Sequence, residues 1–231
     1  MSRLSVIIGT MAGCLVIGGA ASAQTIFTAF DLTTPQPGNS LYSATLGTAF
    51  TVNSAIIVTG LGAFDASAHT LNGTLVTTIY NSSTQTAVPG LSASFTAGSP
   101  GVLQGGYLYK SVGGLLGVVL APGNYVVGWT SLSGNDQNGN GAIPPPIYNE
   151  GGGQITIDKT NTLYNEQSNA VYAGQDKYPI NSFTGKLYGG TFKYTANTPE
   201  PGAVSLFAGL AVMGTSTLLR RRRMNMKKKS A

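Results

Sequence analysis

The middle of the chain carries its hydrophobic residues in short runs, some continuous and some alternating with polar residues. Clusters of Gly, Pro, Asn and Ser separate the runs, and no long segment places apolar residues at the period of a helix. Residues 75–80 are dominated by β-branched side chains, which suit the packed face of a sheet. The pattern predicts strands at residues 49–52, 55–64, 74–80, 91–95, 106–110, 116–120, 124–131, 154–158 and 190–194. Many short strands at this spacing favour an all-β domain over residues 24–196, folded as an antiparallel β-sandwich or jelly roll.

A long polar segment, residues 132–153, interrupts this pattern with Gly, Asn and Pro. So long a stretch inside a domain is usually a functional loop or a disordered one. It contains an Asp-x-Asn-x-Asn-Gly sequence that matches the start of a calcium loop, and the oxygen ligands would be Asp136, Asn138 and Asn140. The twelfth position is Ile147, where a bidentate Glu is needed, and Glu150 comes three residues later. A polar Asn/Gly turn without metal is the interpretation that the missing Glu favours.

The N-terminus has the layout of a secretory signal peptide. A positive start at Arg3 precedes an apolar run over residues 4–20, and small residues follow at the two positions that signal peptidase must accept. The residues of this cleavage site are Ala21, Ala23 and Gln24. We predict a signal helix within residues 1–23 and cleavage after it. A buried helix or an N-terminal membrane anchor is the alternative.

The C-terminus combines a Pro-Glu-Pro motif, an apolar stretch and a basic end. The uncharged run 203–219 has 17 residues, the lower limit for a helix that crosses a ~30 Å hydrocarbon core. The basic end, residues 220–229, would stay cytoplasmic under the positive-inside rule and leave the rest of the chain outside. The motif residues are Pro199, Glu200 and Pro201, and the arginines of the cytoplasmic stop are Arg220, Arg221, Arg222 and Arg223.

This end of the chain resembles the PEP-CTERM sorting domain of exported proteins from Gram-negative bacteria. The resemblance covers residues 198–223, and its three parts occur in the family's order. It implies that residues 197–231 are a sorting tail, held transiently in the inner membrane by a transmembrane helix. It also implies that an exosortase recognises Pro199, Glu200 and Pro201 and cleaves near them. The basic end is longer than usual for the family, and an ordinary tail anchor is the alternative.

Charge is scarce and unevenly placed along the chain. Charged residues make up 9% of the sequence, against about 25% in a typical soluble domain. Between Gln24 and Asn197 there are five basic and seven acidic residues, so the basic stripe that nucleic-acid binding requires is missing. The one cysteine, Cys14, lies in the predicted signal peptide, which leaves no disulfide in a mature chain. We expect an extracellular β-protein with no nucleic-acid partner.

A second resemblance concerns the β domain. Residues 59–65 (TGLGAFD), 75–80 (LVTTIY) and 120–128 (LAPGNYVVG) are similar to the pattern LGxFD, hydrophobic strand, LxxGxYxxG. Jelly-roll modules of exported PEP-CTERM proteins often carry this pattern. The resemblance implies a jelly-roll fold and says little about a ligand.

No set of residues in the sequence forms a recognised catalytic motif. His69 is the only histidine, so a Ser-His-Asp triad would have to use it, and no G-x-S-x-G elbow surrounds a serine. A glycosidase needs two facing carboxylates, which the sequence alone does not identify among its acids. Those acids are Asp65, Asp136, Glu150, Asp158, Glu166 and Asp176. We expect a non-enzymatic protein without a cofactor.

Aromatic residues in or near loops suggest a binding function instead. Jelly-roll modules often bind glycans by stacking sugar rings on aromatic side chains. The candidates are Trp129, Tyr148 and Tyr164, with Tyr172 and Tyr178 as further ones, and each is equally suited to packing in a core. The sequence therefore favours an exported cell-envelope or extracellular-matrix protein. A secreted carbohydrate-binding module is the alternative, and a glycan-active hydrolase comes third. The partners would be signal peptidase and exosortase, the membrane, and an extracellular polysaccharide.

Overall fold

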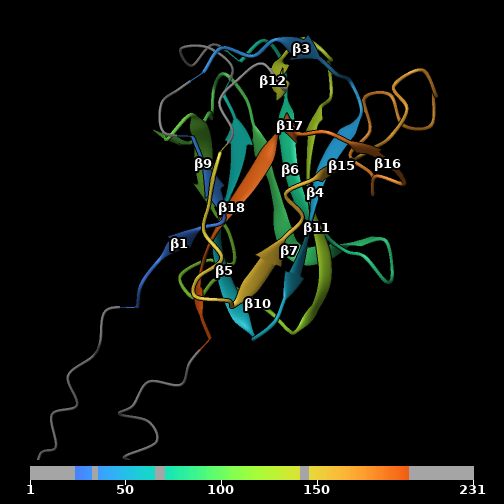
Figure 1. Ribbon diagram of the computed structural model, residues 1–231. Coiled ribbons are helices and arrows are strands. Elements are labelled where there is room, and N and C mark those ends of the chain that lie inside the picture. The colour runs from blue at the N-terminus through green and yellow to red at the C-terminus, as the bar shows by residue number, and fades with distance from the viewer. Residues whose placement is uncertain (1–23, 33–35, 66–70, 141–145, 198–231) are drawn as a thin grey trace, which may run out of the picture. The chain divides into compact units, whose positions relative to one another are not determined.

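The described part of the chain is built from antiparallel β-strands (Figure 1). The computed structural model describes residues 24–32, 36–65, 71–140 and 146–197. Within these ranges there is no helix, and therefore none that is long and apolar enough to cross a membrane. The predicted signal helix and the predicted transmembrane helix both lie outside the described residues. The all-β prediction is confirmed for the part that the structure describes.

Two larger sheets form the body of the domain. The seven-stranded sheet has the order β16 (Asn181–Thr184), β15 (Asn161–Tyr164), β4 (Thr45–Val52), β11 (Gly123–Ser131), β6 (Leu75–Asn81) and β7 (Thr86–Phe95), and β14 (Ile155–Ile157) also pairs with β4. The six-stranded sheet has the order β1 (Phe27–Thr28), β18 (Gly190–Ala196), β5 (Ile56–Phe64), β9 (Tyr107–Ser111) and β8 (Val102–Gln104), and β10 (Val118–Leu120) also pairs with β5. All pairings are antiparallel, and the arrangement is consistent with a β-sandwich.

The core lies between these two sheets. The rings of Phe50 on β4 and Phe192 on β18 have centroids 4.6 Å apart and join two internal strands of the two sheets. Thr77 of β6 donates a hydrogen bond from its hydroxyl to the carbonyl oxygen of Gly62 on β5, at 3.1 Å. Trp129 on β11 has no exposed surface and is among the largest fully buried side chains. Since the apolar residues of both sheets meet here, their burial is the main stabilising contribution to the domain.

The outer faces of the two sheets are covered as well. Nearly every residue of β6 and β11 is buried, although a sandwich strand usually alternates buried and exposed positions. Over the seven-stranded sheet the segment 165–180 supplies Asp176, whose carboxylate accepts hydrogen bonds from Thr78 and Tyr80 of β6. Over the six-stranded sheet, Phe30 exchanges hydrogen bonds with the Thr191 hydroxyl of β18.

The nine strands predicted from the sequence all occur, with ends shifted by a few residues. The prediction that residues 132–153 form one loop is wrong. β12 (Gln137–Asn140) lies between β17 (Leu187–Tyr188) and β3 (Ser40–Leu41), and β13 (Ile147–Tyr148) pairs with β2 (Phe30–Asp31). These short strands are polar or lie at the domain's periphery. They are held by pairing with distant parts of the chain, not by a hydrophobic pattern of their own.

Candidate functional site

Three aromatic side chains gather at one edge of the seven-stranded sheet. Tyr164 lies on β15 and Phe183 on the edge strand β16, and their rings meet edge to face with centroids 5.6 Å apart. Tyr42 joins them by donating a hydrogen bond from its hydroxyl to the carbonyl oxygen of Asn165. Phe183 is 37% exposed, and Tyr42 and Tyr164 are half-buried. We name Tyr42, Tyr164 and Phe183 the edge ledge.

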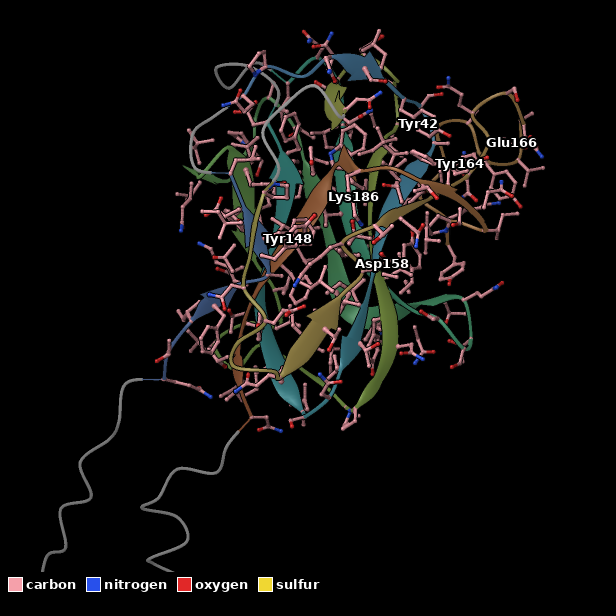
Figure 2. All side chains as sticks on the ribbon, in the orientation of Figure 1. Tyr42, Tyr148, Asp158, Tyr164, Glu166 and Lys186 are labelled. Carbon is pink, nitrogen blue, oxygen red and sulfur yellow. The ribbon has the colours of Figure 1, made fainter. Side chains whose placement is uncertain are left out.

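The surroundings of Tyr42 keep its hydroxyl group protonated. Burial, with smaller contributions from the nearby Tyr164 and Glu166, raises the pKa of Tyr42 to about 12. Figure 2 shows Tyr42, Tyr164 and Glu166 on the same side of the domain. The ledge therefore offers aromatic surface and phenolic hydroxyl groups, and the Glu166 carboxylate lies on the same side of the domain. Sugars are bound by this combination of ring surface and hydrogen-bonding groups.

Tyr148, a predicted glycan contact, lies in a different group of residues. The Lys159 ammonium is 5.6 Å from the centroid of the Tyr148 ring and 3.0 Å from a carboxylate oxygen of Glu150. The other close ring is Phe30, with its centroid 6.2 Å away. Burial raises the pKa of Tyr148 to about 12, with smaller contributions from Tyr188 and Asp158. A cation and a second ring already pack on the Tyr148 ring. Less of its surface is therefore available for stacking on a sugar than in the edge ledge.

Glu150 and Asp158 are occupied by local hydrogen bonds. Glu150 accepts one from the Ile157 amide at 3.0 Å, and this bond and Lys159 lower the pKa of its carboxyl group. Burial alone would raise the pKa of Asp158, but hydrogen bonds from Asn161 and Thr160 outweigh it and the pKa is lowered. A glycosidase needs a general acid with a raised pKa. Neither of these two carboxyl groups has that property.

Lys186 is held beside Asp158 (Figure 2). Its ammonium group donates to the carbonyl oxygens of Asp158 and Asn161. Burial lowers the pKa of Lys186, and the Asp158 charge opposes that shift. These contacts close the turn between β14 and β15, so Lys186 stabilises the sheet edge from which the ledge projects.

Asp176 also has a structural set of partners. Its carboxylate accepts hydrogen bonds from Thr78 at 2.6 Å, Tyr80 at 2.7 Å and Thr130 at 3.2 Å. Burial, followed by the Asp176 charge, raises the pKa of Tyr80 well above its ordinary value. The three hydroxyl groups come from two adjacent strands, β6 and β11, and fix the segment 165–180 over them.

Trp129 does not lie where a sugar could reach it. Its ring is fully buried in the core, and Gly189 packs against it so closely that a Cβ at that position would lie 2.7 Å from the Trp129 Cβ. A ring with no exposed face cannot stack on a ligand from solvent. Trp129 is therefore a core residue and not a glycan-contact residue.

Tyr172 and Tyr178 are half-buried in the segment 165–180, and the Tyr178 ring contacts Tyr80 edge to face.

The three calcium candidates do not form the start of a calcium loop. Residues 137–140 are extended in β12, whereas a calcium loop curls its alternate ligands around one point. Asp136 accepts a hydrogen bond from the Asn72 amide at 2.7 Å, Asn138 donates to the Ser40 carbonyl at 2.9 Å, and Asn140 is exposed. In the ranges that the structure describes, no three His, Cys, Asp or Glu side chains gather closely enough to hold a metal ion.

The remaining predicted residues lie outside the described part of the chain. They are His69, the cleavage-site residues Ala21 and Ala23, the motif residues Pro199, Glu200 and Pro201, and the stop residues Arg220, Arg221, Arg222 and Arg223. Gln24 is the first described residue and is exposed. Tyr42 and Phe183 of the edge ledge were not anticipated from the sequence, since no hydrophobic pattern marks the segments that carry them.

Compared with known proteins, the chain matches no family model, no curated protein and no solved structure.

Proposed function

We propose that this chain is an exported protein of the bacterial cell envelope or extracellular matrix. Signal peptidase removes residues 1–23, and an exosortase recognises Pro199, Glu200 and Pro201 and cleaves the sorting tail. Until then, the apolar run 203–219 holds the protein in the inner membrane, with Arg220 to Arg223 on the cytoplasmic side. The β domain is a jelly-roll-like module that is displayed at the cell surface or released, and it has no catalytic role.

The observation that carries this proposal is the order of signals at the two ends of the sequence. The position of the β domain between them supports it. The contacts within the chain separate Gln24–Asn197 as one compact unit, and these limits fall next to the two predicted processing sites. The Gln24 side chain donates to the carbonyl oxygen of Ala196, and the Asn197 amide donates to that of Ala55 at 3.1 Å. Removing both end segments would therefore leave the sandwich intact.

Intact-mass analysis of membrane and secreted fractions tests this proposal. The secreted form should start at Gln24 and end near the Pro-Glu-Pro motif. A Glu200→Ala variant should accumulate uncut in the membrane fraction, whereas Glu166→Ala, an exposed carboxylate of the β domain, should be processed normally. A secreted form that retains Arg220 to Arg223 would contradict the proposal.

The edge ledge favours carbohydrate binding as a second candidate function of the β domain. Tyr164 and Phe183 place two aromatic rings at a sheet edge, and the edge strand β16 is largely exposed. Pull-down of the secreted form with extracellular polysaccharide should weaken for Tyr164→Ala and for Phe183→Ala. Val102→Ala is the control, because Val102 is 72% exposed on β8 of the other sheet. Equal retention of all three variants would remove the ledge as a glycan site.

A further inference from the structure

An uncharged apolar surface lies beside β10, away from the edge ledge. Leu115 and Leu116 are almost completely exposed, at 105% and 84%, and Val119 of β10 is 56% exposed. Pro89 is exposed and Val88 half-buried, and both line a hollow of 330 Å³ together with Val119. We name Val88, Pro89, Leu115, Leu116 and Val119 the apolar rim. Val88, Pro89 and Val119 share the hollow, and Leu115 and Leu116 lie in the turn that leads into β10. Single exposed apolar residues are common on proteins, but several of them on neighbouring segments mark an interaction site.

The loop of the apolar rim is shaped by glycine. Gly113, Gly114 and Gly117 all have positive φ angles, at 68°, 63° and 68°. A Cβ on Gly117 would lie 2.6 Å from the Val58 carbonyl oxygen, so only glycine fits this close approach to β5. The tight turn places Leu115 and Leu116 between Gly114 and Gly117, where both side chains are almost completely exposed. The exposure of the two leucines therefore results from the local backbone.

The stretch of the chain that carries the apolar rim holds almost no charge. Between residues 71 and 135 the only Lys, Arg, Asp or Glu is Lys110. Its ammonium group donates hydrogen bonds to the carbonyl oxygen of Ser94 and to the Ser99 hydroxyl. The same group lies 5.3 Å from the Phe95 ring centroid. A charged or strongly hydrated partner would find no complementary group here. A hydrocarbon partner needs none.

The rim also lies close to the point where the chain leaves the domain. Val119 of the rim, Ile57 and Thr195 face one another in the adjacent strands β10, β5 and β18. Neighbouring strands are about 4.8 Å apart, so Val119 is about 10 Å from Thr195, two residues before Asn197. From Asn197 to the start of the apolar run at Ala203 there are six Cα–Cα steps, which reach at most about 22 Å. If that run is in a bilayer, the rim is within reach of the same bilayer.

We infer that the apolar rim inserts Leu115 and Leu116 into the lipid bilayer that holds the sorting tail. This inference rests on the proposed function, because it requires the tail to enter the membrane. The second contact holds the β domain against the bilayer and keeps the nearby Pro-Glu-Pro motif at the membrane surface, where a membrane-bound exosortase acts. After cleavage has released the tail, the rim still contacts lipid, and two leucines are a weak, reversible anchor.

A single fluorophore at the rim tests this inference. The only native cysteine is Cys14, so the full chain with Cys14→Ser and Leu115→Cys can be labelled at one site with the environment-sensitive dye NBD. The labelled chain is reconstituted into phosphatidylcholine–phosphatidylglycerol vesicles, and its flotation, compared with that of a chain ending at Asn197, reports whether the tail is inserted. We expect NBD at position 115 to shift its emission to shorter wavelength and to be quenched by spin-labelled lipid. Val119→Cys should behave in the same way, whereas Val171→Cys, which is 56% exposed in the segment 165–180, should stay water-like.

The outcomes separate the two proposals. A chain that floats with the vesicles while positions 115 and 119 stay water-like overturns the rim inference and leaves the sorting tail standing. A chain that does not float contradicts tail insertion, and the rim inference falls with it. A blue shift at position 115 without vesicles that grows with protein concentration would indicate a second copy of the chain at the rim, and it would overturn the lipid assignment.

Discussion

Asp158 is a carboxylate whose hydrogen bonds stay within its own turn. One oxygen accepts from the amides of Thr160 and Asn161 at 2.8 and 2.9 Å, and the other accepts from the Asn161 side chain at 3.0 Å. These bonds favour the charged form, so the lowered pKa of Asp158 reports a structural role in the β14–β15 turn. The same turn supports Tyr164 of the edge ledge, on β15.

We predict that Asp158 contributes to the loss of stability in acid. Its pKa is lower in the folded state, so its contribution is present above the unfolded-state pKa of 3.8 and is lost as pH falls through the folded-state value. The free energy of unfolding in urea, measured between neutral pH and pH 3, should fall less steeply for Asp158→Asn than for the wild type. Equal slopes would mean that the turn does not depend on the carboxylate charge.

Asp31 should show the opposite sign. Burial raises its pKa, and this outweighs the Leu32 amide and Lys193, which lower it. Its contribution is therefore present below the unfolded-state pKa and is lost as pH rises through the folded-state value. In the same titration Asp31→Asn should lose stability in acid more steeply than the wild type. The two aspartate variants should therefore change the pH dependence of the unfolding free energy in opposite directions, and each serves as the control for the other.

At the scale of elements, the segment 165–180 acts as a cover for the seven-stranded sheet. Asn165 ties the two ends of this segment together. Its fully buried side-chain amide donates to the carbonyl oxygens of Lys177 and Tyr178 at 3.2 and 3.1 Å. Its side-chain oxygen accepts from the Ile180 amide at 3.1 Å. One side chain therefore satisfies three backbone groups that no strand pairing serves.

Asn165→Ala should destabilise the domain by about 2–4 kcal/mol, since it leaves these backbone groups without partners. Urea denaturation measures the loss. Limited proteolysis should then cut within residues 165–180 sooner than in the wild type. The control is Asn135→Ala, which changes an exposed Asn. If both variants unfold at the same urea concentration, the closing role of Asn165 is wrong.

The sequence identified all the long strands and missed most of the short ones, for a physical reason. β5, β6 and β11 are seven to nine residues long and are apolar enough to be recognised without knowledge of their neighbours. β12 and β3 form because Asn138 faces Ser40 across 98 residues of sequence, and no local pattern encodes that pairing. Because β11 is buried on both faces, its sequence could not show whether Trp129 points toward solvent or the core. The edge ledge was likewise not predictable, since it depends on the register that brings Phe183 to Tyr164.

At the scale of the whole molecule, the two ends of the β domain meet on one sheet. β1 follows Gln24 and pairs with β18, which ends at Ala196 and also pairs with β5. β18 is therefore an internal strand of the six-stranded sheet, although it is the last strand in the described chain. Its final residues matter for stability because Tyr194 is fully buried and Thr195 is nearly so.

This position of β18 predicts where the chain can be shortened. Residues 24–197 should unfold at the same urea concentration as the full chain in detergent, because the last backbone hydrogen bond of the domain, from the Asn197 amide, is retained. A chain ending at Lys193 loses the Tyr194 ring, and truncating a buried aromatic side chain costs about 3–5 kcal/mol. It also loses the pairing of Tyr194 to Ala196 with β5, so it should be largely unfolded by circular dichroism. A clear loss of stability in 24–197 itself would show that residues beyond Asn197 belong to the folded unit. Processing near the Pro-Glu-Pro motif would then damage the domain that it is proposed to release.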